Sequence, residues 1–369
     1  MIYLDYQATT PVAPEVAAAM RPWIEEKFAN PHSPSRWGSE AAAAIEHARD
    51  QILTVAALDE GRFAFTSGAT EALNWAIKGT AERSERRKLV TIATEHAAVL
   101  DSIEWLEGKG YQVVRLPVGP DGLVDLDAAR DAIDRKTALV AAMLVNNEVG
   151  VIQPVASIAA MAHEAGAVML CDAVQGFGRM DLPEGADLIA ISGHKIHGPK
   201  GVGGLWIRKG FEPRPLLHGG GQEQGLRSGT LAPAPCVGLG EAARLASERR
   251  EADQVHVARL SELALSTLGQ GWEINGSVEQ RYRGNLNVRR DELDSARLIA
   301  DLRNIAFSLG SACASGSGRP SHVLRALGLS DRQARSSIRL GFGRYTGEVE
   351  LVSACRHIAE TARAQRVVR

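Results

Sequence analysis

The chain has 369 residues but only four cysteines, and none of the four has a near neighbour of its own kind. Cys171, Cys236, Cys313 and Cys355 lie far apart, without a Cys-x-x-Cys pair. Such spacing indicates neither a disulfide framework nor a zinc site. Each thiol therefore has to be judged by its own surroundings.

Long apolar runs and an excess of basic charge are also missing. No run approaches the roughly 20 apolar residues that span a bilayer, and residues 1–6 lack the basic and apolar regions of a signal peptide. The 42 basic and 44 acidic side chains give a net charge of -2, without the positive excess of nucleic-acid-binding proteins. We therefore expect a cytoplasmic protein that contacts neither membrane nor nucleic acid directly and whose ligands are small molecules or other proteins.

Glycine is the residue in excess, at 37 of 369 positions, and it clusters between apolar segments. Short apolar runs alternate with amphipathic ones from residue 62 to residue 208, which is typical of an α/β fold whose mostly parallel sheet is covered by helices on both faces. The predicted strands are 62–66, 89–93, 111–117, 137–145, 168–172, 187–192 and 203–208, with helices from Thr70 and over 95–108.

A different pattern follows the Pro-Ala-Pro turn at 233–235. A long helix is predicted over 237–268, with a charged middle that indicates a solvated face. Strands at 272–275, 284–288 and 337–341, a helix at 294–304 and a closing helix indicate a smaller α+β domain. The predicted division is an N-terminal arm at 1–15 that packs on the small domain, a large domain at 16–250, and a small domain at 251–369.

The segment 65–71, Phe-Thr-Ser-Gly-Ala-Thr-Glu, lies where a predicted strand ends and a helix begins. Free backbone N–H groups at a helix start, a glycine turn and the hydroxyl of Thr70 suit a phosphate. The alternative is that the Ser or Thr at this junction only caps the helix.

Lys195 lies in a glycine-rich turn directly after an apolar strand, in Ser192-Gly193-His194-Lys195. Poor solvation there lowers the pKa of a lysine and frees its amine for Schiff-base formation with an aldehyde. The alternative, a basic surface turn, suits the nearby Lys200 better.

Asp172 ends another predicted strand, about twenty residues before Lys195. Ligands of open α/β sheets bind at the carboxyl ends of strands, and an acid there can hold a pyridinium nitrogen. A helix-capping aspartate is the equal alternative.

Cys313 is surrounded by small residues in the segment 308–318, Ser-Leu-Gly-Ser-Ala-Cys-Ala-Ser-Gly-Ser-Gly. Such a segment cannot be packed into a core and is expected to form a mobile, exposed loop. On these residues alone it is either a linker with an incidental thiol or the carrier of a reactive one. The other three cysteines fall in apolar or amphipathic patterns and are expected to be structural.

Together these segments resemble the cysteine desulfurases of the NifS/IscS type, within the class V aminotransferases. The resemblance runs over nearly the whole chain. Besides the motifs above, it rests on Tyr3-Leu4-Asp5-Tyr6-Gln7-Ala8-Thr9-Thr10-Pro11, Thr94-Glu95-His96, Asn146-Asn147-Glu148-Val149-Gly150, Gly219-Gly220-Gly221-Gln222-Glu223 and Arg227-Ser228-Gly229-Thr230. It implies the pyridoxal-phosphate-dependent transferase fold of type I.

The resemblance also implies a site for pyridoxal 5′-phosphate. Lys195 would carry the cofactor and move protons at the substrate Cα, Asp172 would hold the pyridine nitrogen and Gln175 the phenolic oxygen, and His96 would stack on the ring and assist proton transfer. The phosphate would be bound by Ala69, Thr70, Ser192 and His194, and by Thr230 of the neighbouring subunit, which requires a homodimer.

The implied reaction converts L-cysteine to L-alanine. Cys313 would take the sulfur as a persulfide, and Arg339 and Asn147 would hold the substrate carboxylate. The sulfur would pass to acceptor proteins, such as an iron–sulfur scaffold, or to tRNA thiolation. The alternatives are a selenocysteine lyase or another class V enzyme, and a non-catalytic sulfur-relay scaffold, against which the presence of Lys195 and Asp172 argues.

Overall fold

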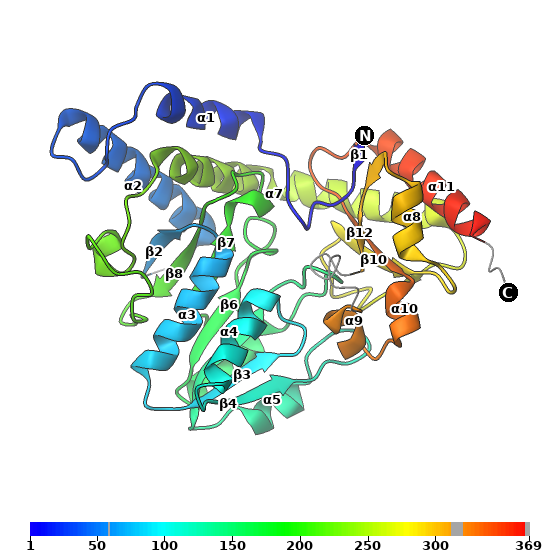
Figure 1. Ribbon diagram of the computed structural model, residues 1–369, viewed down its shortest axis with the longest axis horizontal. Coiled ribbons are helices and arrows are strands. Elements are labelled where there is room, and N and C mark those ends of the chain that lie inside the picture. Colours follow the sequence, from blue (N-terminus) through cyan, green and yellow to red (C-terminus); the bar gives the residue numbers. More distant parts are fainter. Residues whose placement is uncertain (58–59, 311–319, 366–369) are drawn as a thin grey trace.

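The computed structural model describes residues 1–57, 60–310 and 320–365, and Figure 1 shows their arrangement. A seven-stranded sheet occupies the larger part, in the order β2-β8-β7-β6-β5-β3-β4. Its strands are β2 Gly61–Thr66, β3 Lys88–Ile92, β4 Gln112–Leu116, β5 Thr137–Met143, β6 Val168–Asp172, β7 Leu188–Ser192 and β8 Gly203–Arg208. The strands from β7 to β4 pair in parallel, and β8 is antiparallel to both of its neighbours. The predicted mostly parallel sheet is confirmed.

Successive side chains of a strand point to opposite faces of a sheet. In this sheet they enter two different apolar clusters, which shows that both faces are buried. In β2, Phe63 and Phe65 join one cluster while Ala64 joins the other. Figure 1 shows α3 and α4 in front of the sheet, and α1, α2 and α7 running together above it. The covering helices are α1 Pro14–Glu25, α2 Arg36–Ala56, α3 Ala69–Arg83, α4 Ala97–Glu107, α5 Leu126–Ala132 and α6 Val155–Glu164.

The smaller part contains a four-stranded antiparallel sheet in the order β12-β13-β10-β9. Its elements are β9 Glu273–Ile274, β10 Asn285–Arg289, α8 Ser295–Asp301, β11 Ile305–Ala306, β12 Ser308–Leu309, α9 His322–Ala326, α10 Asp331–Arg335, β13 Ser337–Gly341 and α11 Glu348–Ala364. The chain start, β1 Ile2–Tyr3, pairs in parallel with β11. The arm thereby adds Leu4 to the apolar cluster of this part.

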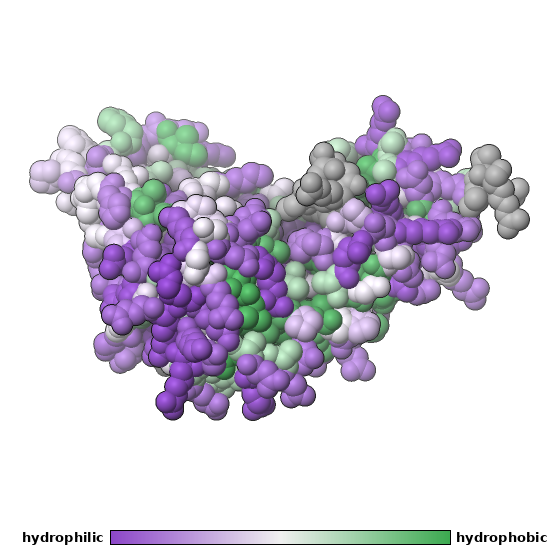
Figure 2. All heavy atoms as spheres, turned by 60° about the horizontal axis from the view of Figure 1, so that its bottom comes forward, coloured by the Kyte–Doolittle hydropathy of each residue, from purple (hydrophilic) through white to green (hydrophobic). Residues whose placement is uncertain are grey.

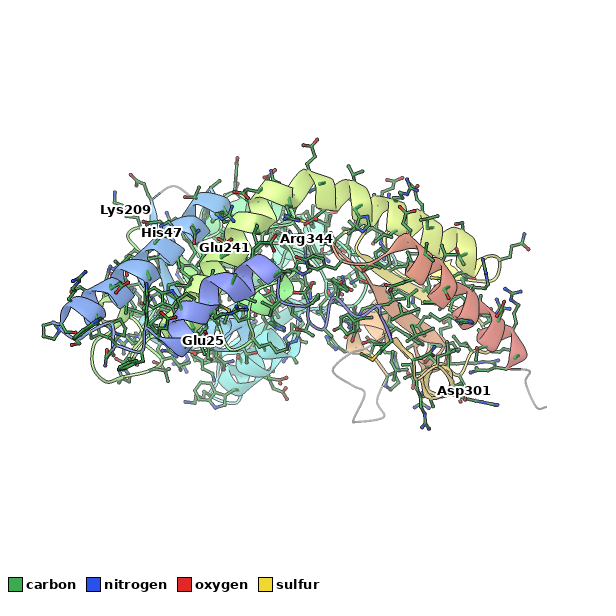
Figure 3. All side chains as sticks on the ribbon, turned by 90° about the horizontal axis from the view of Figure 1, so that it is seen from above. Glu25, His47, Lys209, Glu241, Asp301 and Arg344 are labelled. Atoms are coloured by element: carbon green, nitrogen blue, oxygen red, sulfur yellow. The ribbon has the colours of Figure 1, made fainter. Side chains whose placement is uncertain are left out.

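Helix α7, Pro233–Leu268, joins the two parts. It begins four residues before the predicted start, because a proline is well accommodated at the first helical position. Residues from Cys236 to Ala246 pack in a large-sheet cluster, and those from Val257 to Leu268 pack in the smaller part. Seen from above in Figure 3, the helix crosses the molecule, with His47 and Glu241 over one part and Asp301 on the other. The predicted domain boundary at 250 falls within this helix and stays a prediction.

Polar side chains predominate on the face shown in Figure 2, where apolar residues gather in a band near the middle. Over the described ranges, no helix has the length and apolar character needed to cross a membrane.

Val288 and Val349 test the packing of the smaller part. Val288 is fully buried in β10, whereas Val349 on α11 is 84% exposed. We expect Val288→Ala to lower the free energy of unfolding by about 2 kcal/mol, because it removes buried apolar volume and leaves a cavity. Val349→Ala should change it by less than about 0.5 kcal/mol. Urea unfolding followed by two probes measures both, and equal midpoints for the two variants would contradict the assigned core.

Candidate active site

A cavity of about 680 Å³ lies at the carboxyl ends of the parallel strands. This volume is in the range that holds a small-molecule ligand. Its wall brings together ten residues that the sequence singled out: Ala69, Thr70, His96, Asn147, Asp172, Gln175, Ser192, His194, Lys195 and Arg339. Separate loops of one sheet edge supply most of them, as expected for the carboxyl ends of an open α/β sheet.

The turn between β2 and α3 has the form of an anion cradle. Gly68, at φ +152°, is the N-cap residue of α3, and no side chain caps the helix. Thr70 is therefore not the cap, and its hydroxyl belongs to the first helical turn at the cavity wall. Gly203 of β8 packs on this turn so closely that a Cβ there would lie 2.9 Å from the Gly68 Cα.

Glu71 anchors the same turn to the segment that ends at Thr230. Its Oε2 accepts from the Ser67 N–H at 2.8 Å, and its Oε1 accepts from Arg227 Nε at 2.8 Å. Burial raises the pKa of this carboxyl, but the hydrogen bonds from Arg227 and Ser67 outweigh that effect and lower the pKa below its usual value.

Lys195 ends the short turn Gly193–Lys195 that follows β7. Its Nζ donates to the backbone oxygens of Gln7 at 2.6 Å and Ala8 at 2.8 Å. The amine is thus held at the cavity wall by the N-terminal arm. His194 Nδ1 lies 3.1 Å from the Thr9 hydroxyl, and burial, with the nearby Lys195 and Lys200, lowers the pKa of this histidine to about 4.

Asp172 is the last residue of β6 and is buried. Its Oδ1 accepts from the Val174 N–H at 3.0 Å. Burial raises the pKa of Asp172, although this N–H and the neighbouring His96 and Lys195 act in the opposite direction. A cationic group placed beside this carboxylate would lower the cost of its ionised form.

His96 is the N-cap residue of α4, and its Nδ1 accepts from the Ala98 N–H at 3.1 Å. Nδ1 is therefore unprotonated, and Nε2 carries the proton of the neutral ring. Burial lowers the pKa of His96, so the ring is neutral at physiological pH.

Arg339 of β13 is fully buried at the junction of the two parts. Its guanidinium donates to Asp5 Oδ1 at 2.7 Å, to the Asn147 backbone oxygen at 2.9 Å and to Ser308 Oγ at 3.2 Å. Within the described residues its Nε has no hydrogen-bond partner. Arg339 lines the cavity, and a planar guanidinium suits an anionic ligand group.

The residues present fit pyridoxal phosphate. The start of α3, which no side chain caps, offers backbone N–H groups to a phosphate. The buried Asp172 suits a protonated ring nitrogen, and Lys195 lines the same cavity.

Two further predicted residues remain to be placed. Cys313 lies outside the described residues. Thr230 is exposed and is not one of the described residues that line the cavity.

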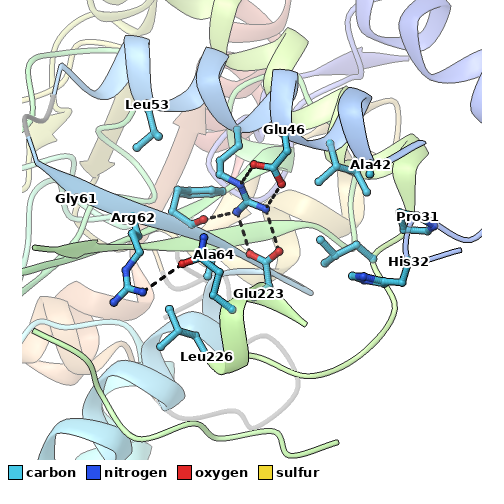
Figure 4. Close-up of a pocket in the computed structure, with 15 residues that line it drawn as sticks. Pro31, His32, Ala42, Glu46, Leu53, Gly61, Arg62, Ala64, Glu223 and Leu226 are labelled. Carbon is cyan, nitrogen blue, oxygen red and sulfur yellow. Dashed lines mark hydrogen bonds and ion pairs between the residues drawn. The ribbon is translucent and has the colours of Figure 1, made fainter. Parts of the chain in front are cut away.

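A second cavity, of about 360 Å³, lies between α2 and β2, as shown in Figure 4. Arg49 donates to Glu223 Oε2 at 2.9 Å and pairs with Glu46, while Glu223 also accepts from the Phe65 N–H. Glu223, from the motif at 219–223, thus fastens that segment to β2 and α2. The charge of Glu223 is already paired with that of Arg49. Among the described residues that line it, the second cavity lacks the combination of amine, carboxylate and imidazole groups that lines the first.

Asp5, Gln7 and Arg179 also hold the site together, although no sequence pattern gives them a role. Asp5 and Gln7 lie within the quoted motif at 3–11, but a backbone oxygen that receives Lys195 leaves no mark in a side-chain pattern. Arg179, four residues after Gln175, contacts both Gln175 and Lys195. The spacing of four residues between Gln175 and Arg179 is the sequence feature that indicates their contact.

Comparison with known sequences gives one consistent match. The sequence model described as aminotransferase class-V matches residues 2–352. The protein named cysteine desulfurase IscS of Rickettsia rickettsii (strain Iowa) is 44% identical over 363 residues, which cover 95% of this chain and 88% of the relative. The protein of the same name from Rickettsia bellii (strain OSU 85-389) is 44% identical over 370 residues, covering 97% of this chain and 90% of its own.

Solved structures agree. A structure titled "NIFS-LIKE PROTEIN" superposes with a TM-score of 0.92 at 35% identity, covering 98% of this chain and 99% of that one. A structure titled "SspA in complex with cysteine" has a TM-score of 0.84 at 36% identity, covering 94% of this chain and 100% of that one. The predicted type I fold of pyridoxal-phosphate enzymes is confirmed.

The three described cysteines are predicted to be chemically inert in the folded protein. Cys171, Cys236 and Cys355 are buried, and burial raises the pKa of Cys236 and of Cys355 to about 12 and that of Cys171 well above its usual value. Since the thiolate is the reactive form, Cys313→Ser should show almost no rapid thiol modification by an aromatic disulfide reagent at pH 8. The same variant in denaturant should show three thiols, and rapid modification of any of them in the native state would contradict this assignment.

Proposed function

We propose a function on the premise that this chain belongs to the class V aminotransferase family, whose sequence model covers nearly all of it. The protein is a pyridoxal-phosphate-dependent cysteine desulfurase, which converts L-cysteine to L-alanine and retains the sulfur. One observation carries the proposal: ten residues expected for cofactor and substrate line one cavity. The cofactor, when bound, withdraws electrons from the substrate Cα and makes its proton acidic.

The residues around the cavity have distinct proposed roles. Lys195 holds the cofactor aldehyde and, once displaced by the substrate amine, moves the Cα proton. Asp172 keeps the ring nitrogen protonated, and Gln175 donates to the phenolic oxygen. The neutral His96 stacks on the ring and exchanges a proton through Nε2, since its Nδ1 is engaged by the Ala98 N–H.

The phosphate is assigned to the turn at the start of α3 and to the end of β7. Backbone N–H groups of the helix start and the hydroxyl of Thr70 receive it, and Ser192 and His194 complete the site from the neighbouring strand end. Ala69 brings its N–H group within the same turn.

Substrate recognition is assigned to Arg339 and Asn147. Arg339 lines the cavity, and its planar guanidinium suits a carboxylate. In the net reaction the Cβ–S bond of L-cysteine breaks, the sulfur bonds to the thiolate of Cys313 as a persulfide, and the Cβ takes up a proton to give L-alanine.

Partners follow from the product. A persulfide has to be passed on, so the proposal includes sulfur-acceptor proteins, for iron–sulfur cluster assembly or tRNA thiolation. The proposal also includes a cytoplasmic homodimer in which Thr230 reaches the phosphate of the other subunit. Two observations support this role of Thr230: its side chain is exposed, and Arg227, three residues earlier, pairs with Glu71 beside the proposed phosphate site.

The activity is tested with purified protein loaded with pyridoxal phosphate. L-Cysteine and a reductant should give L-alanine and sulfide, and Lys195→Ala should lower the rate by at least about 1,000-fold because both cofactor attachment and proton transfer are lost.

Cys313→Ala should release sulfide at least about 100-fold more slowly, since the nucleophile is lost, whereas Cys236→Ala should keep the wild-type rate. A wild-type chain that forms no alanine would disprove the desulfurase function. Wild-type sulfide release by Cys313→Ala would disprove the persulfide step alone.

Subunit complementation tests the role of Thr230. Thr230→Val and Lys195→Ala should each be impaired, but a mixed dimer has one site with both wild-type residues. Random pairing of equal amounts should restore roughly a quarter of the wild-type sites. Activity that merely averages the two separate variants would show that Thr230 serves its own subunit or none.

A further inference from the structure

Arg179 lies behind the cavity wall, in the turn that follows β6. Its NH1 donates to Gln175 Oε1 at 2.7 Å and to the Gln175 backbone oxygen at 3.1 Å, while its NH2 donates to the Lys195 backbone oxygen at 2.6 Å. One guanidinium therefore bridges two residues of the cavity wall without lining that cavity itself.

These contacts fix the direction of the Gln175 amide. A guanidinium can only donate hydrogen bonds, so the atom that faces Arg179 has to be the amide oxygen. The amide nitrogen then points the other way and donates to the Gln7 backbone oxygen at 3.0 Å. An amide nitrogen carries two hydrogens, and Gln175 lines the cavity. The second N–H is left to a cavity ligand.

Arg179 is itself held from two sides. Gln254 of α7 donates to its backbone oxygen at 2.7 Å, and its guanidinium carbon lies 4.9 Å from the centre of the Tyr282 ring. A cation over an aromatic ring is attracted to it. The guanidinium is thus fixed before any ligand enters.

We infer that Arg179 is a positioning residue that locks the Gln175 amide with its N–H toward the phenolic oxygen of the cofactor and fixes the backbone of Lys195. The inference rests on the proposed function. Without Arg179, only the hydrogen bond from the amide nitrogen to the Gln7 oxygen holds the amide. Its second N–H is then less well directed, and the hydrogen bond to the phenolic oxygen is weakened.

The test measures the bound cofactor rather than turnover. A donated N–H stabilises the deprotonated phenolic oxygen, so its loss should raise the pH midpoint of the visible absorbance change of the loaded enzyme. For Arg179→Met we expect a rise of about 0.5–1 pH unit, the effect of one hydrogen bond. The dissociation constant for pyridoxal phosphate added to the apoprotein should rise about 5- to 10-fold.

A double-mutant cycle separates positioning from a general loss of charge. Gln175→Leu should give a similar midpoint shift, and Arg179→Met should add little to it, because both remove the same N–H. Arg250→Met is the matched control: Arg250 pairs with the exposed Asp181 and should keep the wild-type midpoint and affinity. Additive shifts in the cycle, or a wild-type midpoint for Arg179→Met, overturn the inference.

If Arg179→Met does not fold, Arg179→Lys replaces it. An ammonium lacks the planar fork that reaches both acceptors, so the midpoint should shift in the same direction, and wild-type values overturn the inference. If the wild-type chain takes up no pyridoxal phosphate, the proposed function fails and this inference fails with it. A loaded wild type with unchanged variants disproves the inference alone.

Discussion

The carbonyl oxygen of Gln7 accepts hydrogen bonds from both Lys195 and Gln175, and the rest of the site depends on where the arm places it. The arm is fixed by the smaller part: the Gln7 amide donates to the Gly284 oxygen at 2.9 Å, and the Tyr6 N–H donates to the Gly341 oxygen at 3.2 Å. The first residues of the chain therefore connect a lysine from the large sheet to strands of the small one. A site built this way forms only when both parts are in place.

Burial of charge is the second physical condition of the site. Asp172 and Glu95 are both buried, and burial raises the pKa of each carboxyl. The negative charge of Asp172 raises the pKa of Glu95 further. Glu95 accepts one N–H, from Met143, and its other oxygen has no hydrogen-bond partner within the described chain. Such groups are costly in a low dielectric. Asp172 lines the cavity, where a cationic ligand group would offset this cost.

Much of this architecture was predictable from the sequence, for identifiable reasons. Thr70, Asp172 and Lys195 lie at or just after predicted strand ends, which placed them at one edge of a parallel sheet, and the structure gathers them in one cavity. Local pattern failed where the partner is distant. Asp5 meets Arg339 across 334 positions, and no periodicity encodes that pair. The start of α7 was missed because the Pro-Ala-Pro segment reads as a turn, although a proline fits the first turn of a helix.

Helix α7 also constrains how this chain can change in length. Its middle, around residues 248–254, is largely exposed and highly charged, so most single substitutions there should be tolerated. An inserted residue is different, because each α-helical residue adds about 100° of rotation and about 1.5 Å of rise. One insertion would turn Val257, Leu260 and Ala264 away from the apolar cluster they fill. This exposed stretch of α7 thus fixes the rotation of the residues that pack in one core relative to those that pack in the other. Substitutions are tolerated there, but insertions and deletions are not.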